Sequence, residues 1–398
     1  MIRHLFTLIW NRKKSNFLMI TEIFFSFIVL FGVLSLGFFY LDNYRQELGF
    51  QYDKVWVMSM RWNQERDPEV AEVQRRLRQQ LASNKEVAGV AGAGFNIPYN
   101  MGTSNSRFSY GNRSTMADIF QADQDFAQVM QLQVTEGRWF SDQDQGSGLE
   151  LLVINKAMRE KLFPGEPVVG KVVPWGHEGG PSKIIGVISA FRQKGEYSQV
   201  QPGMFRFVDW EKPADSTAVA GFASNLLIRV RPGVSRAFEE KLMKQASQVA
   251  KGWTLEMETM EEMRASTNKI ALIPLVVFSI VCGFLIINVA LGLFGVLWYN
   301  INRRISEIGL RRAIGAASGQ VYRQFVGEVL VLATFGILAG VLVAAQFPLL
   351  AVFGVQPAIY LAAMAASVLL IYLLATGCAA YPSRQAAGIP PATALHEE

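Results

Sequence analysis

The chain has 398 residues, of which 51% are hydrophobic, and a net charge of +5. Residues 41–268 carry 27 basic and 28 acidic side chains, whereas the remainder carries 11 and 5. The basic surplus therefore flanks four long apolar segments, where it would contact anionic lipid, and this argues against a nucleic-acid-binding surface. Both cysteines, Cys282 and Cys378, lie within apolar segments, so the central segment has no disulfide framework.

Residues 1–16 are basic and partly apolar, which predicts an amphipathic helix on the cytosolic face of a membrane. A cleaved signal peptide is the rival interpretation, but the apolar segment 17–40 is too long for one and lacks a small-residue cleavage site. We expect residues 17–40 to form the first transmembrane helix. Glu22 would lie roughly 9 Å into this helix. It could belong to a proton relay, or its carboxylate could reach the cytosolic interface or an arginine.

Residues 41–269 follow the first span and, with the N-terminus inside the cell, are expected to form an extracytoplasmic (periplasmic) domain. The stretches 42–48 and 260–269 are predicted to continue the neighbouring spans as a helical stalk. Between them, the apolar periodicity twice changes from strand to helix and back, as in a βαβ unit. The first unit comprises residues 55–60, 68–83 and 87–95, and the second comprises residues 225–230, 234–250 and 253–257. Two such units predict a ferredoxin-like α/β layer.

Residues 96–224, between the two units, are predicted to form an inserted β-rich subdomain. Its β-prone segments are 151–154, 183–188 and 204–208. Asp142 and Asp144 could form a catalytic carboxylate pair, but a hydrophilic loop explains them better. We therefore expect this subdomain to be a scaffold.

Residues 270–298 carry no formal charge and predict the second transmembrane helix, with a bend at Pro274. The segment 299–324 that follows is short and strongly basic, so the positive-inside rule places it in the cytosol. Its charged residues are Arg303, Arg304, Glu307, Arg311, Arg312 and Arg323.

The cytosolic segment is also patterned as two short helices with a turn between them. Glu307 and Arg311 are four residues apart and can pair on a helix. Gly315 is placed to end the first helix, and Ser318 to cap the second. Three isoleucines fall on one face of the first helix: Ile301, Ile305 and Ile308.

Residues 325–347 and 358–381 predict the third and fourth transmembrane helices, joined by an uncharged turn at 348–357. Gly336 and Gly340 form a small-residue face for close helix packing, although lipid-facing filler is an alternative. Pro382 is predicted to end the fourth helix, and residues 382–398 to form a cytosolic tail. Four spans with both termini in the cytoplasm satisfy the charge distribution.

Motifs for catalysis and nucleotide binding are missing from the sequence. No phosphate-binding G-x-x-x-x-G-K-[ST] loop is present, and neither H-E-x-x-H nor G-x-S-x-G occurs. The three histidines, His4, His177 and His396, are too far apart to hold a metal together. We therefore expect no catalytic residue, no metal and no cofactor in this chain.

Two motifs at the C-terminal half carry a family resemblance. EIGLRRAIGA, followed by QVYRQFVGE at the next span, resembles the coupling segment of FtsX-like permeases, which include MacB-type exporters and lipoprotein-release permeases. The tail from Tyr381-Pro382-Ser383-Arg384 to Ala394-Leu395 is similar to the end of that family. In the inserted subdomain, a third stretch resembles the MacB-type extracytoplasmic domain through Gly137-Arg138, Phe140, Asp144, Asn155, Leu162-Phe163, Gly170-Lys171 and Ile185-Gly186-Val187.

The resemblance implies an inner-membrane ABC transporter permease with four transmembrane helices and a MacB-like periplasmic domain. A separate ABC ATPase would bind ATP and Mg, and a second permease, identical or related, would complete a dimer in the lipid bilayer. The coupling helices would transmit ATP-driven motion to the periplasmic domain, a mechanotransmission that drives efflux of a drug, peptide or other substrate from the periplasmic side. The residues that would seat on the ATPase are Glu307, Ile308, Gly309, Leu310, Arg311, Arg312 and Gly315.

Three alternatives stay open at this level. The chain could be a lipoprotein-releasing permease, or an FtsX-like regulator of a periplasmic cell-wall hydrolase. A membrane-anchored sensor without an ATPase is a third reading, against which the coupling motif argues. The sequence leaves open the substrate, the choice between homodimer and heterodimer, and whether a periplasmic adaptor and an outer-membrane channel take part.

Overall fold

The computed structural model describes residues 13–62, 67–100, 102–145, 147–174, 181–207, 224–303, 305, 308, 310 and 313–388. The chain forms two compact units. The α/β unit is Asn43–Ala271, and the helical unit comprises the residues before and after it. The unit boundary falls inside two helices, so the last residues of the first long helix and the first residues of the second belong to the α/β unit.

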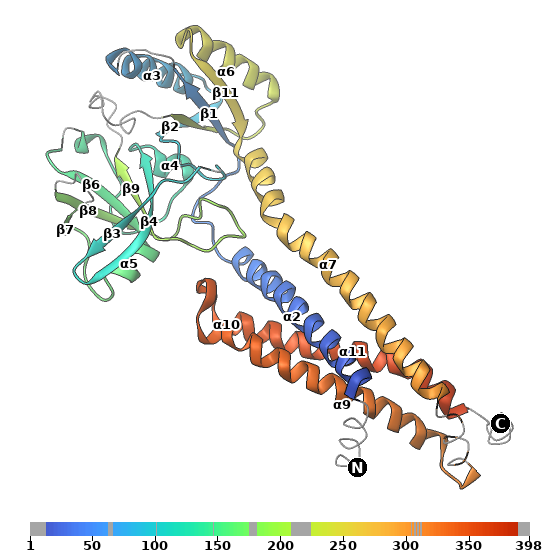
Figure 1. Ribbon diagram of the computed structural model, residues 1–398. Coiled ribbons are helices and arrows are strands. Elements are labelled where there is room, and N and C mark those ends of the chain that lie inside the picture. Colours follow the sequence, from blue (N-terminus) through green and yellow to red (C-terminus); the bar gives the residue numbers. More distant parts are fainter. Residues whose placement is uncertain are drawn as a thin grey trace. The chain divides into compact units, whose positions relative to one another are not determined.

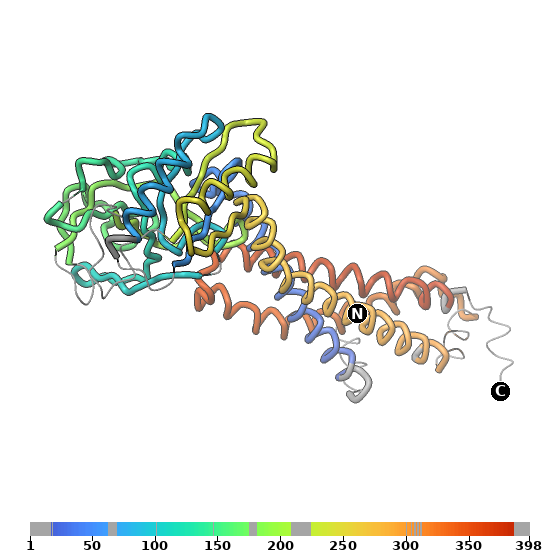
Figure 2. The backbone as a smooth tube through the Cα atoms, turned by 90° about the horizontal axis from the view of Figure 1, so that it is seen from above, coloured from blue at the N-terminus to red at the C-terminus, as the bar shows by residue number. Residues whose placement is uncertain are grey.

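Four long helices run side by side in the helical unit (Figures 1 and 2): α2 (Lys13–Tyr44), α7 (Met260–Asn302), α9 (Ser318–Ala344) and α11 (Pro357–Gly388). Each contains an apolar segment long enough to cross a membrane, with a mean hydropathy between 2.3 and 3.0. Buried side chains from all four form one apolar core, including Phe27, Leu293, Ile337 and Ala375. The prediction of four membrane helices is therefore confirmed.

Two helix ends differ from the predicted ones. Helix α11 continues past Pro382 to Gly388. Pro382 and Ser383 are both buried, so packing offsets the one backbone hydrogen bond that an internal proline removes. Helix α2 ends at Tyr44, short of the predicted helical stretch 42–48, because the chain turns away toward Gly49. Gly49 has a φ of 82°, and a Cβ there would lie 2.0 Å from the carbonyl oxygen of Ala190.

Other boundaries are shifted in segment 299–324 and at the predicted turn between the third and fourth spans. Helix α9 begins at Ser318 itself, with Ala317 at the N-cap, and continues into the third span without a break. The predicted turn at 348–357 contains the short helix η3 (Val352–Gly354), and a second short helix, α10 (Gln346–Leu349), lies across its start. Helix α7 is uninterrupted at Pro274. Of the predicted N-terminal amphipathic helix, residues 13–16 begin α2, and residues 1–12 lie outside the described part of the chain.

A ferredoxin-like layer forms one end of the sheet in the α/β unit, with strands in the order β11-β1-β10-β2 and all neighbours antiparallel. Its elements are β1 (Val55–Arg61), α3 (Asp67–Ala82), β2 (Val87–Ala93), β10 (Asn225–Val230), α6 (Arg236–Val249) and β11 (Thr254–Thr259). Both helices cover the same face of these strands, where Met58, Leu77 and Leu242 are fully buried (Figure 1). The two predicted βαβ units are therefore confirmed.

The segment between the two units, here called the inserted lobe (residues 94–224), extends the same sheet in the order β4-β9-β6-β8-β5. Its strand β4 joins β2 through the pair Ala93 and Ala122. Strands β6 and β8 are parallel, with α5 between them in the chain, so the lobe is mixed α/β rather than purely β-rich. The elements are β3 (Asn105–Tyr110), β4 (Arg113–Ala122), α4 (Phe126–Met130), β5 (Val134–Gly137), η1 (Asp142–Asp144), β6 (Glu150–Asn155), α5 (Lys156–Leu162), β7 (Val172–Pro174), β8 (Pro181–Ile188) and β9 (Gly203–Phe207).

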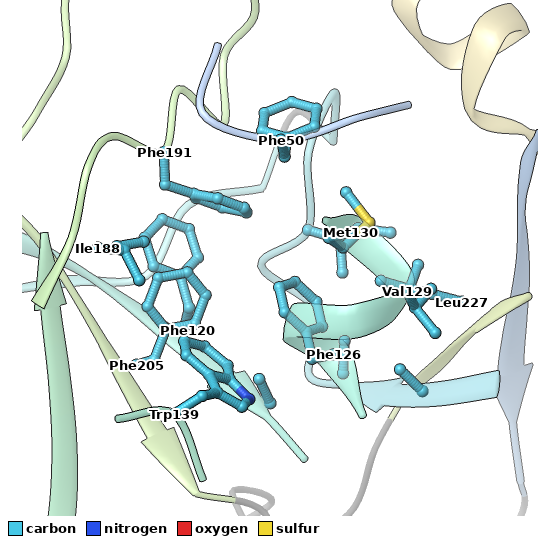
Figure 3. Close-up of a cluster of buried hydrophobic side chains, with 14 of the residues drawn as sticks. Phe50, Phe120, Phe126, Val129, Met130, Trp139, Ile188, Phe191, Phe205 and Leu227 are labelled. Carbon is cyan, nitrogen blue, oxygen red and sulfur yellow. The ribbon is translucent and has the colours of Figure 1, made fainter. Parts of the chain in front are cut away.

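An aromatic core fills the inserted lobe and reaches the ferredoxin-like layer (Figure 3). The ring of Phe191 packs edge-on against Phe120 and Phe205, with centroids 4.8 and 5.0 Å apart. Phe126 and Met130 of α4 point into the same core, beside Leu227 of β10. Such ring pairs prefer edge-to-face geometry and add stability beyond the apolar area that they bury.

Candidate functional site: the coupling segment and the helix junction

The described part of segment 299–324, which was predicted to be cytosolic, has a buried face. Ile301 at the end of α7, Ile308, and Val321 and Phe325 of α9 form a small apolar cluster of their own. Ile308 is 4% exposed and packs against the end of α7 and the start of α9. Because of this packing, displacement of the segment would displace the ends of α7 and α9.

The opposite side of the segment exposes two aliphatic side chains. Leu310 is 53% exposed and Ile314 is 79% exposed. They are one helical turn apart, since the Ile314 N–H donates to the Leu310 carbonyl at 3.0 Å. Gly315 follows with a φ of 103°, in the left-handed region, which confirms its predicted position at the helix end. Ile314 was not among the predicted coupling residues, although its spacing from Leu310 could have indicated it.

The remaining predicted coupling residues, Glu307, Gly309, Arg311 and Arg312, lie outside the described residues. Arg303, which precedes them, is exposed, and its guanidinium lies 5.6 Å from the ring centroid of Tyr299. Among its described residues, the segment therefore presents two exposed cations, Arg303 and Arg323, and two exposed large aliphatic side chains.

The two predicted packing glycines lie against α2. A Cβ at Gly336 would be 2.8 Å from Ile23, and one at Gly340 would be 2.3 Å from the ring of Phe27. A third close approach involves the membrane acid, since a Cβ at Gly292 of α7 would be 2.7 Å from the Glu22 carboxylate. Glu22 therefore lies half-buried against α7 within the helical unit.

A second feature, which we call the helix junction, lies within the α/β unit. A loop of residues 191–198, the junction loop, follows β8 and contacts both helices that cross the unit boundary. Arg192 is 1% exposed, and its guanidinium donates hydrogen bonds to the carbonyls of Asn43, Gln46, Glu196 and Ser198. Asn43 is in the last turn of α2, where carbonyls lack partners within the helix. Arg192 therefore caps the C-terminus of α2.

The other side of the junction loop contacts α7. The Glu196 carboxylate, whose side chain is 6% exposed, forms an ion pair with Arg264. The Arg264 guanidinium also lies 4.6 Å from the ring centroid of Tyr52, which precedes β1. The ion pair compensates the charge of the buried Glu196 carboxylate, which would cost on the order of several kcal/mol if it were left unpaired.

Tyr99 of the inserted lobe connects the loop to α7 through its backbone. Its N–H donates to the carbonyl of Gln193 at 2.8 Å, and its carbonyl accepts from the Thr267 hydroxyl at 2.9 Å. The residue has a φ of 62°, which is uncommon for a bulky side chain. Burial is the main cause that raises the pKa of the Tyr99 hydroxyl, and the negative charge of the nearby Glu196 carboxylate raises it further.

The sequence predicted no metal site and no catalytic residue in this chain. Among the described residues, no three His, Cys, Asp or Glu side chains are grouped so that they could hold a metal ion. All three histidines lie outside the described residues. Asp144 corrects the hydrophilic-loop interpretation: it is 7% exposed and forms a two-pronged pair with Arg138, with both N···O distances at 2.6 Å.

Comparison with known sequences decides the family. A profile of the MacB-like periplasmic core domain matches residues 17–245, more than half of the chain, and a profile of the FtsX-like permease C-terminal region matches residues 276–391. The chain belongs to the MacB/FtsX family of ABC transporter permeases. Family membership and the four apolar helices together make it a membrane protein. The predicted combination of four membrane helices with a MacB-like α/β domain is confirmed.

Individual relatives are distant. An uncharacterised ABC transporter permease, YknZ of Bacillus subtilis, is 24% identical over 233 residues, which is 58% of this chain and 57% of that protein. The macrolide export ATP-binding/permease protein MacB of Chromobacterium violaceum is 28% identical over 273 residues, covering 64% of this chain and 39% of MacB. The chain therefore spans between about two fifths and three fifths of these relatives. The periplasmic region of MacB from Actinobacillus actinomycetemcomitans aligns with 56% of this chain and 97% of its own, at 13% identity and a TM-score of 0.39.

Proposed function

We propose that this MacB/FtsX-type permease couples ATP hydrolysis by a partner ABC ATPase to a conformational change in its α/β unit, in the efflux of a substrate from the periplasmic side of the inner membrane. The α/β unit would be periplasmic, both termini would be cytoplasmic, and a second permease would complete the dimer. The name of the MacB relative, a macrolide export ATP-binding/permease protein, supports a role in export and the pairing of a permease with an ATP-binding function. The 398 residues contain no phosphate-binding loop motif, and the proposal assigns the ATP site to the partner ATPase.

The observation that carries the proposal is the two-sided coupling segment. One side, at Ile308, packs on α7 and α9, and the other exposes Leu310 and Ile314. Contact with water is unfavourable for exposed aliphatic side chains, so the free energy falls when a partner covers them. The arrangement can therefore bind an ATPase on one side and move two membrane helices on the other.

The test replaces the exposed pair, in the variant Leu310→Gln/Ile314→Gln. Both side chains lie outside the apolar cores, so membrane abundance should stay normal. The amount of ATPase that co-purifies with the permease should fall roughly tenfold or more, because central apolar contacts carry much of the affinity of an interface. Gly309→Trp and Arg311→Glu, at positions chosen from the sequence motif, should have the same effect.

A matched control is Leu350→Gln, since Leu350 is 73% exposed and directly follows α10, beyond the far end of α9. This variant should retain the ATPase. If the Leu310→Gln/Ile314→Gln protein binds the ATPase as wild type does, the coupling role of the segment is wrong.

A further inference from the structure

The inserted lobe and the two membrane-crossing helices meet at the junction loop, which the proposed function leaves without a role. The ferredoxin-like layer needs no such loop to move together with α7, because β11 ends at Thr259 and α7 begins at the next residue, Met260. Met260 is fully buried in the aromatic core, so this covalent connection is also firmly packed. The inserted lobe has no such direct covalent connection to α2 or α7, since its chain returns to each of them through the ferredoxin-like layer.

The junction loop is anchored in the lobe at its first residue. Phe191 is 3% exposed and contacts the rings of Phe120, Phe205, Phe126 and Phe50, from four separate parts of the chain (Figure 3). Close-packed interiors have little free volume, so this ring cannot shift far unless its neighbours move as well. Arg192 directly follows Phe191, and its hydrogen bonds to α2 are therefore fixed relative to the lobe.

The loop also has little slack between its two helix contacts. Arg192, which contacts α2, and Glu196, which contacts α7, are four residues apart, a separation of at most about 14 Å in an extended chain. The Arg192 guanidinium reduces this reach further by bonding to the carbonyls of Glu196 and Ser198, and the Gly195 N–H donates to the Arg192 carbonyl at 2.9 Å. A relative displacement of the α2 and α7 ends must therefore either break one of these contacts or move the loop.

We propose that residues 191–198 are a tether that transmits relative motion of α2 and α7 to the inserted lobe. Arg192 is its attachment to α2, and the Glu196–Arg264 pair is its charged attachment to α7, beside the neutral hydrogen bond from Thr267 to Tyr99. The inference rests on the proposed function, because ATP-driven motion must reach these helices first. Breaking a contact that is buried and charged is costlier than moving a short, internally bonded loop. The loop, and with it Phe191 and the lobe core, follows the helices.

The experiment uses the full-length permease with its co-purifying ATPase in lipid nanodiscs, either nucleotide-free or trapped with ADP and orthovanadate. Hydrogen–deuterium exchange is compared in peptides from the lobe strands β3 and β4 and from β1 and β11 of the ferredoxin-like layer. The test variant is Glu196→Gln/Arg264→Gln, which removes both charges so that neither is left buried alone. Glu196→Gln alone is a second variant, because it keeps the side-chain shape and an oxygen acceptor for Arg264.

In the wild type, trapping should change exchange in both regions. In the double variant the change should persist in β1 and β11 but fall at least about fivefold in β3 and β4, with an intermediate loss in Glu196→Gln. Nucleotide-free exchange in the lobe should match the wild type, which separates loss of coupling from loss of folding. If the lobe of the double variant responds to trapping as the wild type does, the tether is overturned. If the double variant does not fold, a full lobe response in Glu196→Gln overturns it instead.

A matched control is Arg236→Gln. Arg236 pairs with Glu262 of α7 at 3.2 Å, but its side chain is 90% exposed and it belongs to α6 of the ferredoxin-like layer. Its loss should leave the lobe response intact. If trapping changes nothing in either region of the wild type, the proposed function itself is wrong, and the tether falls with it.

Discussion

The Asp144 carboxylate accepts hydrogen bonds from the Arg138 guanidinium and from the Ser141 N–H, the latter at 2.9 Å. The Arg138 hydrogen bonds are the main reason that the pKa of Asp144 is below its usual range. A lowered folded pKa means that the pair stabilises the protein fully above the unfolded value of about 3.9, and that this contribution is lost as the pH falls through the folded pKa. At the residue scale, this pair closes the turn between β5 and β6.

Asp144→Asn should lower the free energy of unfolding by roughly 1 to 2 kcal/mol at pH 7, because half of the Arg138 side chain is in solvent and screens the pair. Thermal unfolding of the detergent-solubilised protein measures the loss as a lower Tm. The difference in Tm between the variant and the wild type should be smaller at pH 3 than at pH 7. Asp142→Asn is the control, since Asp142 is exposed in the same turn and should leave Tm unchanged. A gap that stays constant with pH would contradict the ion-pair explanation.

The packing of α9 on α2 is a property of whole elements rather than of single contacts. Gly336 and Gly340 are one turn apart and let the backbone of α9 approach Ile23 and Phe27, which are fully buried. Gly327, on the same helix, has no atom within 4 Å of where a Cβ would be. One helix therefore contains a crowded glycine and an open one, and the pair provides a matched comparison.

Gly340→Ala should destabilise the helical unit by about 1 to 3 kcal/mol, because the new methyl group would overlap the ring of Phe27. Gly327→Ala should instead be neutral or stabilising by up to about 1 kcal/mol, because alanine favours helix. The midpoints of thermal unfolding in detergent compare the two. Equal midpoints would show that α9 does not pack on α2 through Gly340.

At the scale of the whole molecule, the uneven charge distribution predicts the orientation in the membrane. The basic surplus lies outside residues 41–268, mostly beside the apolar segments, so the flanks belong on the cytosolic side. Ser147 in the inserted lobe and Ser318 at the start of α9 are both exposed, and they fall on opposite sides of the predicted topology.

Single cysteines at Ser147 and Ser318, each in a background without Cys282 and Cys378, test this orientation on intact spheroplasts. An impermeant thiol reagent should label the cysteine at 147 but not the one at 318, because only the first would face outward. Permeabilised cells, in which both should react, are the control. Labelling at 318 alone would reverse the topology.

The sequence by itself determined the features that depend on composition and periodicity. Apolar length predicted α2, α7, α9 and α11 as membrane helices, and alternation between periods 2 and 3.6 predicted both βαβ units. The coupling motif indicated the family because its residues are contiguous in the chain. Gly315 could be placed at a helix end because glycine alone adopts a left-handed backbone at little cost.

Only the tertiary structure decided the features that depend on residues far apart in the chain. Pro382 predicted a helix end, but burial of that turn keeps α11 helical. Arg192 looks like one more surface cation in its local sequence, and no local pattern shows that it caps a helix 149 residues earlier. Glu196 and Arg264 are 68 residues apart, and their pairing depends on how the loop and α7 pack. Long-range burial and pairing are set by the fold, because the contacts that compensate a buried charge come from distant parts of the chain.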